Sequence, residues 1–519
     1  MYAKKRVPLQ AKSLNLNRDI KTANPQEVTM NKLYPLTQTQ LGIYLSESNA
    51  PEGSDYNIAL LYYLDNDVDT LCLKQALAQT VNKHPYLKAH LVQDEAGQLF
   101  LEERDTDPVI VQEMSVLTKA DVLDRVVKRF DLLHDTLYRF IIFTLADGER
   151  LLYMDFHHIL CDGMSCTTFH QEVSAAYDEL SKGESESESE SEKTEHYGFE
   201  VAEQEEQQRH AADYQTNKQW YAAEFAPAAE VVSMPLGDGC DSQKAEVESQ
   251  KWVTEFVPIE VNAKDLEDIC TRAEVGISIP FTAALGYTLA NYNASESALF
   301  ATIWHGRKDK EHLNDIGMFV KTLPVFMRFD TTDTTSLLQR LKEQIHGARE
   351  HCLYSFAEVC SDLDIHPQVC FAYHANLHMY HLVLNGKEQR DEFIRHHRPG
   401  LELIVNLIKQ ERGYEIKIEY NRQTYTEAFI RQFCATYEQV LRGILQGQSL
   451  NAIELVKERP ALPPVHQVDK QETIVHLFRQ AAQTYPNNAA VIYRDKQLSY
   501  KELDALSDSM AAEIRERCP

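Results

Sequence analysis

The stretch from His157 to Gly163, which reads HHILCDG, constrains the chain more than any other. It follows a segment in which Leu152, Met154 and Phe156 alternate as one face of a strand would. Beyond it, apolar residues recur at helical spacing, and Ser165 can cap the helix that they predict. The sequence therefore predicts a strand, a tight turn and a helix, with two histidines and an aspartate at their junction.

The side chains of this junction suit acid–base chemistry, because an imidazole titrates near neutral pH. Adjacent side chains on an extended backbone point in opposite directions, so one of His157 and His158 is expected to be structural. Periodicity alone does not decide which one. Asp162 could orient an imidazole, or it could pair with an arginine and pin the turn. Gly163 fits a position that needs a positive φ or a close approach of the backbone to a substrate.

Charge and cysteine usage exclude several classes of protein. A formal net charge of −27 argues against a nucleic-acid surface. No apolar run could span a bilayer or serve as a signal peptide, so we expect a cytoplasmic protein. The 10 cysteines show neither a CxxC pair nor metal-ligand spacing, which predicts reduced thiols and no metal. Cys161, inside the motif, could be a nucleophile, but we expect it to pack in the core.

The apolar pattern predicts an α/β protein of two similar lobes followed by a short further piece. The expected parts are a flexible extension at 1–29, an N-terminal lobe at 30–205 with a disordered acidic loop at 183–206, a C-terminal lobe at 206–455, a linker at 456–470 and a terminal piece at 471–519. In the first lobe a helix is expected at 120–131. The second-lobe strands are predicted at 252–257, 299–304, 320–329, 369–373, 401–409 and 415–420, and its helices at 264–273, 279–291, 336–351 and 427–444.

In this setting, HHxxxDG resembles the active-site motif of condensation domains of non-ribosomal peptide synthetases, which are chloramphenicol-acetyltransferase-like acyltransferases. Further motifs resemble that family in its own order: YPLTQTQ at 34–40, NKHPYLK at 82–88 for RHExLR, and IGMFVKTLP at 316–324 for IGxFVNT. The chain departs from the family at Lys83, Pro85, Lys88 and Lys321, and at Met164, where Trp is common. The resemblance covers about residues 30–448. LSYKEL at 498–503 resembles the LTYxEL that begins an adenylation domain.

The resemblance implies a V-shaped pseudo-dimer of two lobes with a central tunnel, acting as an amide-forming acyltransferase. Donor and acceptor would arrive on the phosphopantetheine arms of carrier proteins, with acyl-CoA as another donor, while the chain itself, a monomer, binds no cofactor. His158 would be catalytic, either as the base or by orienting the amine. His157 and Asp162 would support the turn, and the backbone of Gly163 would approach the oxyanion. The arginine paired with Asp162 would be Arg307, with Arg328 as the second candidate.

Several subtypes and classes stay open. The condensation domain comes first in this sequence, with no carrier before it, which favours a starter domain that joins a fatty acyl group to the first amino acid (lipoinitiation). The alternative is an elongation domain that receives its donor from a separate protein through residues 1–29. His157 and Asp162 also fit the HxxxxD spacing of glycerolipid acyltransferases, although the second lobe argues against that family. Heterocyclising relatives lack the histidines, and epimerising relatives follow a carrier. A non-catalytic platform for carriers is the remaining alternative. The terminal piece is too short to activate amino acids.

Overall fold

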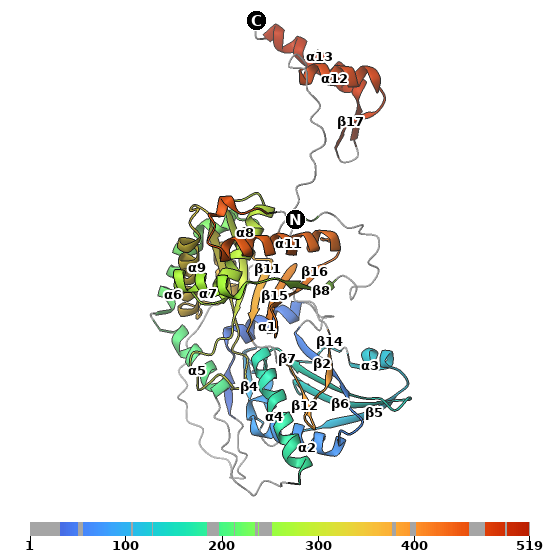
Figure 1. Cartoon of the computed structure of the whole chain (residues 1–519), viewed down its shortest axis with the longest axis vertical. Helices are drawn as coiled ribbons and strands as arrows, with labels where there is room; N and C mark the ends of the chain where they lie inside the picture. Colours follow the sequence, from blue (N-terminus) through green and yellow to red (C-terminus); the bar gives the residue numbers. More distant parts are fainter. Residues whose placement is uncertain are drawn as a thin grey trace. The chain divides into compact units, whose positions relative to one another are not determined.

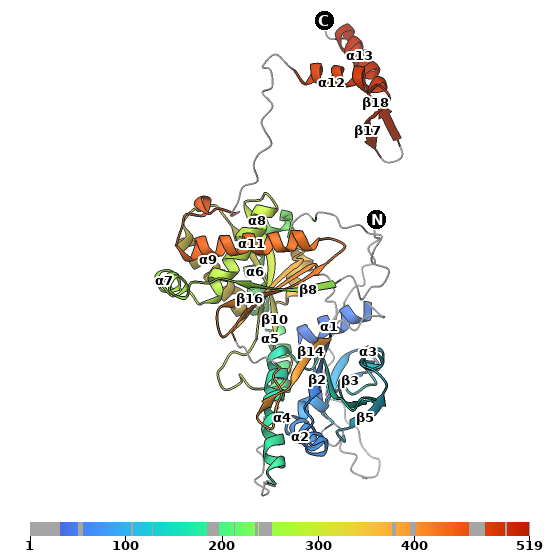
Figure 2. The same cartoon turned by 45° about the vertical axis from the view of Figure 1, so that its right-hand side comes forward.

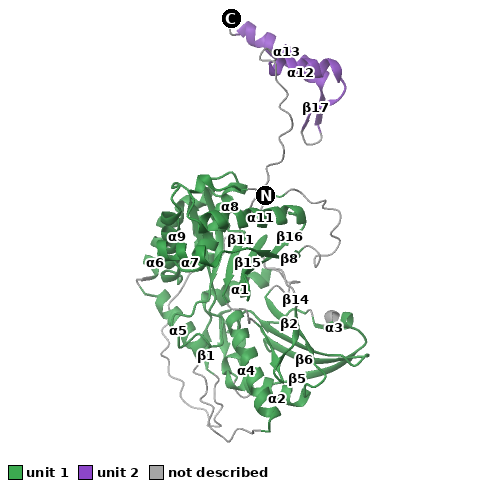
Figure 3. Cartoon of the chain, viewed as in Figure 1, with its two compact units in different colours: residues 1–455 green, residues 456–519 purple. Residues whose placement is uncertain are grey.

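The computed structural model describes residues 32–49, 56–104, 107–126, 128–183, 197–211, 213–233, 237, 252–375, 380–394, 401–455, 473–493 and 496–517. The chain forms two compact units, residues 1–455 and 456–519 (Figure 3). The boundary falls where the C-terminal lobe was predicted to end. The predicted extension at 1–29 and the linker at 456–470 lie outside the described residues. No helix among the described residues has the length and apolar character to cross a bilayer.

The first lobe is built on a mixed five-stranded sheet in the order β14-β2-β7-β6-β5. Its strands are β2 (Asn57–Leu64), β5 (Val111–Val116), β6 (Tyr138–Leu145), β7 (Arg150–His157) and β14 (Arg390–Ile394). Helices α2 (Thr70–Lys83) and α4 (Gly163–Ser181) cover one face of this sheet (Figure 1). The alternation along β7 explains this packing, because Leu152, Met154 and Phe156 join the same apolar cluster as Leu73 of α2 and Phe169 of α4.

Smaller elements surround this layer. They are the sheet β1-β4-β3 (Leu33–Pro35, Leu99–Glu102 and His90–Gln93), the helices α1 (Gln38–Asn49), α3 (Lys119–Val126) and α5 (Tyr197–Arg209), and a 3-10 turn at Pro85–Lys88. Tyr34 of β1 stacks on Phe199 of α5 with ring centroids 4.0 Å apart. Because α5 begins at Tyr197, residues 197–206 are helical, and the prediction of a disordered loop that reaches residue 206 is wrong. An aromatic residue on one face ties this acidic helix to the lobe. Residues 184–196 lie outside the described part.

The second lobe has a six-stranded sheet in the order β10-β9-β11-β15-β16-β8. The strands are β8 (Trp252–Ile259), β9 (Ser297–Trp304), β10 (Lys321–Arg328), β11 (Val369–His374), β15 (Leu403–Lys409) and β16 (Tyr414–Asn421). The helices are α6 (Asp213–Phe225), α7 (Ala263–Ala273), α8 (Ser278–Tyr292), α9 (Thr334–Glu350), α10 (Phe356–Leu363) and α11 (Glu427–Leu445). Figure 2 shows α7, α8, α9 and α11 on the same side of the sheet. Each second-lobe strand and helix predicted from the sequence is present, within a few residues.

One segment of the second lobe crosses into the first. β14 pairs antiparallel with β2, with Ile394 opposite Ala59, and in Figure 1 it is the orange strand beside the blue ones. Nearby, the hydroxyl of Tyr62 donates to the carbonyl of Tyr380 at 2.6 Å, and the short strands β12 (Val383–Leu384) and β13 (Lys387–Glu388) form a hairpin. The prediction that 206–455 form one lobe is therefore wrong for this segment, because β14 supplies the hydrogen-bonding partner that the edge of β2 needs.

The terminal unit contains α12 (Ile474–Thr484), a hairpin of β17 (Ala489–Tyr493) and β18 (Lys496–Ser499), and α13 (Tyr500–Arg517). The unit leaves large apolar side chains exposed on each helix, such as Ile474 at 87% and Met510 at 63%. The terminal unit has too few residues to form a core that could bury these apolar side chains.

Candidate active site

The motif forms the turn between β7, which ends at His157, and α4, which begins at Gly163. Asp162 caps α4, because its Oδ1 accepts the backbone N–H of Ser165 at 2.9 Å. The expectation that Ser165 is the cap was wrong, since the helix starts before its apolar spacing begins. Gly163 has a helical backbone, so the option of a positive φ is also wrong. The close approach of its backbone to a substrate stays a prediction.

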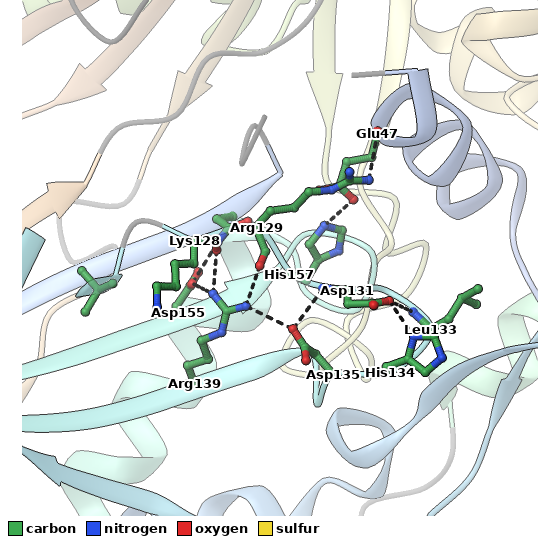
Figure 4. A network of polar contacts seen from close by, with 12 residues as sticks. Glu47, Lys128, Arg129, Asp131, Leu133, His134, Asp135, Arg139, Asp155 and His157 are labelled. Atoms are coloured by element: carbon green, nitrogen blue, oxygen red, sulfur yellow. Dashed lines mark hydrogen bonds and ion pairs between the residues drawn. The ribbon is translucent and has the colours of Figure 1, made fainter. Parts of the chain in front are cut away.

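His157 is fully buried and is contacted on both ring nitrogens. Its Nδ1 accepts the backbone N–H of Ile159 at 3.1 Å. Its Nε2 lies 3.0 Å from Oε2 of Glu47 on α1 (Figure 4). The ring of Phe130 meets the imidazole edge-on, with centroids 5.6 Å apart. This enclosure leaves His157 no room to meet a substrate.

His158 has a different environment from its neighbour. Its backbone N–H donates to the carbonyl of Tyr56 at 2.7 Å, which fixes the chain at the start of the turn. The residue is half-buried, whereas His157, Ile159 and Leu160 are buried. Of the two adjacent histidines, His158 is therefore the one that keeps surface for a reacting group.

Asp162 is held by an arginine from the second lobe. Arg307 donates from one guanidinium nitrogen to Oδ2 at 2.9 Å and from the other to Oδ1 at 3.1 Å. The backbone N–H of Phe319 adds a bond to Oδ2 at 3.1 Å, and the Ser165 hydroxyl lies 2.8 Å from Oδ1. Both oxygens are thus occupied, and Asp162 and Arg307 are 1% and 2% exposed. Asp162 could have oriented an imidazole or paired with an arginine. In the structure it pairs with Arg307, and this pair fixes the turn. Arg328 lies elsewhere, at the end of β10.

The second-lobe segment that carries Arg307 folds tightly against the motif. Gly306 has φ +73°, and a Cβ there would lie 1.8 Å from the carbonyl oxygen of Phe319. The Ser165 hydroxyl accepts the Gly317 N–H at 3.0 Å, and its single proton is shared between Oδ1 of Asp162 and the Gly317 carbonyl, which is 2.8 Å away. The IGMFVKTLP motif therefore lies directly on the first turn of α4.

The two other first-lobe motifs also meet at this turn. Gln40, from the opening motif, donates to the Tyr86 hydroxyl and to the Ile159 carbonyl, both at 2.8 Å. His84, beside Tyr86, places Nε2 2.5 Å from a carboxylate oxygen of Glu172 on α4. Although burial alone would raise the pKa of Glu172, bonds and charge from His84 and Lys83 lower it. The opening motif, the NKHPYLK motif and the IGMFVKTLP motif thus each contact the turn or the helix α4 that follows it.

Lys321, which replaces the usual Asn of its motif, makes a partly buried ion pair. Its Nζ lies 2.9 Å from Oε2 of Glu205 on α5, and Oε1 of Glu205 accepts the backbone N–H of Gln38 at 2.6 Å. Burial alone would lower the pKa of Lys321, but the adjacent charge and hydrogen bond of Glu205 raise it overall. The substitution therefore links β10 of the second lobe to α5.

A second acidic group lies on the same face of β7 as His157. Asp155 accepts hydrogen bonds from the Tyr153 hydroxyl at 2.8 Å and from Asn57 at 2.9 Å. Arg139 lies 3.4 Å from the same carboxylate (Figure 4). Burial outweighs these contacts and raises the pKa of Asp155 to about 7. This carboxyl therefore titrates near neutral pH.

Cys161 packs in the core, as expected. It is fully buried, and its Sγ lies 3.3 Å from that of Cys166, whose thiol pKa is raised by burial. Because Cys161 has no exposed surface that a substrate could reach, it is not placed to act as a nucleophile. Among the described residues, no cluster of three His, Cys, Asp or Glu side chains could hold a metal.

Sequence reasoning missed Glu47 and Arg129. Glu47 shares the buried face of α1 with Gln40 and Ile43, which precede it by seven and four residues. Two of these three residues are polar, so the sequence does not mark this face of the helix as buried, and only the fold shows that the carboxylate needs a partner. Nothing in the spacing indicated that the partner would be His157.

The condensation-domain profile matches residues 30–459. The chain belongs to the condensation-domain family. Tyrocidine synthase 3 of Brevibacillus parabrevis is 24% identical over 94% of this chain, and the match spans 8% of that relative's length. The resemblance to condensation domains of non-ribosomal peptide synthetases is therefore confirmed at the level of the family.

Solved structures confirm the two-lobed α/β fold of the chloramphenicol-acetyltransferase type. The first condensation domain of the calcium-dependent antibiotic synthetase, in complex with a substrate analogue, superposes with a TM-score of 0.65 at 17% identity, covering 82% of this condensation chain and 100% of the other. A mutant starter condensation domain of rhizomide synthetase, in complex with C8-CoA, gives 0.64 at 17% identity and covers 82% and 98%.

Proposed function

We propose that this chain forms an amide bond by attack of an acceptor's α-amine, carried on a phosphopantetheine arm, on an acyl thioester. One observation carries the proposal: of two adjacent histidines, His157 is enclosed and His158 keeps exposed surface on a turn anchored from both lobes. Membership of the condensation-domain family supports it. Carrier proteins are the proposed partners, and the chain itself needs no bound cofactor.

The reaction needs positioning and a place for one proton. A C–N bond forms as the α-amine attacks, the C–S bond then breaks, and the released thiolate takes up the proton that the nitrogen loses. An α-ammonium has a pKa near 8, so an amine held in place needs only a moderate base. His158 is the group proposed to take this proton or to hold the amine through it. The first turn of α4, at Gly163, directs the positive end of a helix dipole at the developing oxyanion.

We further propose the starter subtype, with a fatty acyl donor on CoA or on an acyl carrier protein. The support is the match in fold to a starter domain crystallised with C8-CoA. Fold alone does not separate the subtypes, because another condensation domain matches equally well. An elongation domain with an aminoacyl or peptidyl donor is therefore the alternative. The chain spans a small part of the curated relatives that it matches, and the donor must be identified by experiment.

The test is to incubate the protein with an acceptor carrier loaded with an amino acid and with acyl-CoAs of several lengths. Mass spectrometry of the carrier should show an N-acylated aminoacyl product. A peptide product from an aminoacyl carrier, with no product from any acyl-CoA, would favour the elongation alternative.

His158→Ala should lower the rate of this reaction by about 10²-fold or more, the usual contribution of a positioned acid or base. The matched control is His134→Ala, which removes an exposed histidine paired only with Asp131 on the surface. Product at the normal rate from His158→Ala would contradict the role of His158 and favour the non-catalytic platform.

A further inference from the structure

Glu47 is a carboxylate buried within the first lobe. It is 1% exposed and comes from α1, whose other buried residues are Gln40 and Ile43. Burying a charge is costly unless other charges or hydrogen bonds offset the loss of water. The contacts of Glu47 are therefore the reason that it can occupy this position.

These contacts are His157 and Arg129. Oε2 of Glu47 lies 3.0 Å from Nε2 of His157, and Oε1 lies 3.7 Å from Nε of Arg129. The guanidinium of Arg129 also donates to the backbone carbonyl of Glu47 at 3.1 Å. Figure 4 shows Arg129 and the imidazole on adjoining sides of the carboxylate.

The opposite nitrogen of the imidazole determines where its proton lies. Nδ1 of His157 accepts the N–H of Ile159, and a ring nitrogen can accept only when it carries no hydrogen. The neutral ring must therefore carry its proton on Nε2, which is the nitrogen that lies against Glu47. Nε2 and the Glu47 oxygens do not meet the geometry of a hydrogen bond, so at 3.0 Å this is a close electrostatic contact that lacks hydrogen-bond alignment.

The segment that presents Arg129 is itself fixed. Arg139 donates to the carbonyls of Lys128 at 2.6 Å and Arg129 at 2.9 Å, and its guanidinium stacks 3.6 Å from the ring of Phe130. Phe130 in turn packs on His157. The carboxylate, the arginine and the imidazole are thus supported by one connected group of residues.

We propose that Glu47 is a positioning residue: its carboxylate holds His157 in the Nε2–H form, so that Nδ1 keeps the Ile159 N–H and fixes the turn that carries His158. If the proton moved to Nδ1, two N–H groups would face each other beside His158. The turn would then lose the bond that sets its shape. The effect on rate rests on the proposed function, whereas the tautomer does not.

Two substitutions separate this role from simple burial. Glu47→Gln keeps the shape and an oxygen that can accept the Nε2–H, so kcat should stay within about threefold of the wild type. Glu47→Leu removes the acceptor, and kcat should fall about tenfold or more with an unchanged KM for the acceptor carrier, because the catalytic group is displaced. Asp131→Asn, at an exposed carboxylate near the same segment, is the matched control and should leave both constants unchanged. An unchanged kcat in Glu47→Leu, or equal losses in Glu47→Gln and Glu47→Leu, would overturn the proposal.

A spectroscopic measurement keeps the proposal testable without turnover. In protein labelled with ¹⁵N-histidine, the ring signals of His157, assigned by their loss in His157→Gln, should show a protonated Nε2 and an unprotonated Nδ1. Glu47→Leu should change this pattern, whereas Glu47→Gln should keep it. A protonated Nδ1 in the wild type would overturn the proposal. Absence of any amide product from the wild type would instead contradict the proposed function and leave this measurement intact.

Discussion

The turn that carries His158 is held from two sides, and the two sides use different chemistry. On the second-lobe side, Arg307 makes two short bonds to Asp162, at 2.9 and 3.1 Å, and both carboxylate oxygens have further donors. On the first-lobe side, Glu47 lies 3.0 Å from His157, without hydrogen-bond alignment, and 3.7 Å from Arg129. We call the Arg307–Asp162 pair the second-lobe anchor and the Glu47–His157 contact the first-lobe anchor. The second-lobe anchor is saturated with hydrogen bonds, while the first-lobe anchor depends on which ring nitrogen of His157 carries the proton.

This difference assigns separate tasks to the two anchors. A buried, bidentate pair of formal charges joins segments 145 residues apart, so its loss should first affect folding. In a contact between a carboxylate and an imidazole, the proton can move from one ring nitrogen to the other without unfolding the lobe. Loss of the Glu47–His157 contact should therefore first affect the reaction rate. The comparison therefore predicts that stability and activity respond to different substitutions around the same turn.

The largest effect on stability is expected from Arg307→Met. Asp162 would remain buried with its charge uncompensated, which costs about 3–5 kcal/mol in the free energy of unfolding. Urea unfolding followed by circular dichroism measures this change. The control is Arg328→Met, at an exposed arginine that the sequence offered as the second candidate, and it should change the free energy by less than about 0.5 kcal/mol. Similar losses of unfolding free energy in Arg307→Met and Arg328→Met would contradict a special role of the Arg307–Asp162 pair in stability.

The next effect is a pH dependence on the first-lobe side. The pKa of Asp155 is raised to about 7 in the fold, above its ordinary value of 3.8, because burial favours the protonated form. Between these values the folded state binds more protons than the unfolded state, so the stability that Asp155 contributes is present at low pH and is lost as pH rises towards 7.

Asp155→Asn should abolish this dependence. The difference in unfolding free energy between wild type and variant should shift by about 3 kcal/mol in favour of the wild type between pH 8 and pH 5, since each pKa unit corresponds to about 1.4 kcal/mol. Urea unfolding at the two pH values measures it. Parallel pH profiles for the two proteins would show that Asp155 is ionised in the fold, and that its network does not titrate near neutral pH.

The sequence predicted much of the frame on which these anchors stand. The alternation of Leu152, Met154 and Phe156 placed β7, and turn residues with helical spacing placed α4. The choice of Arg307 over Arg328 came from family resemblance, because periodicity cannot say which arginine of a distant lobe will reach the turn.

The parts that could not be predicted depend on contacts between distant residues. Glu47 reads as one more acid in a negatively charged chain until the fold brings it to His157, 110 residues away in sequence. β14 carries no local sign that it will leave its own lobe to pair with β2. The cap at Asp162 was missed because apolar spacing marks the body of a helix better than its first turn.

The smallest effect tests how closely the second-lobe anchor is packed. The Ser165 hydroxyl shares its proton between Asp162 and the Gly317 carbonyl and accepts the Gly317 N–H. Ser165→Ala would therefore take this partner from the buried N–H and carbonyl of Gly317, while Asp162 would keep its other donors. We expect a loss of about 1–3 kcal/mol in unfolding free energy, which thermal or urea unfolding can measure. Ser181→Ala, at an exposed hydroxyl bonded only within the end of the same helix, should change it by less than about 0.5 kcal/mol. If the two serines proved equivalent, the hydroxyl would add nothing to the anchor, and the bonds of Arg307 and the Phe319 N–H to Asp162 would join the second lobe to the turn.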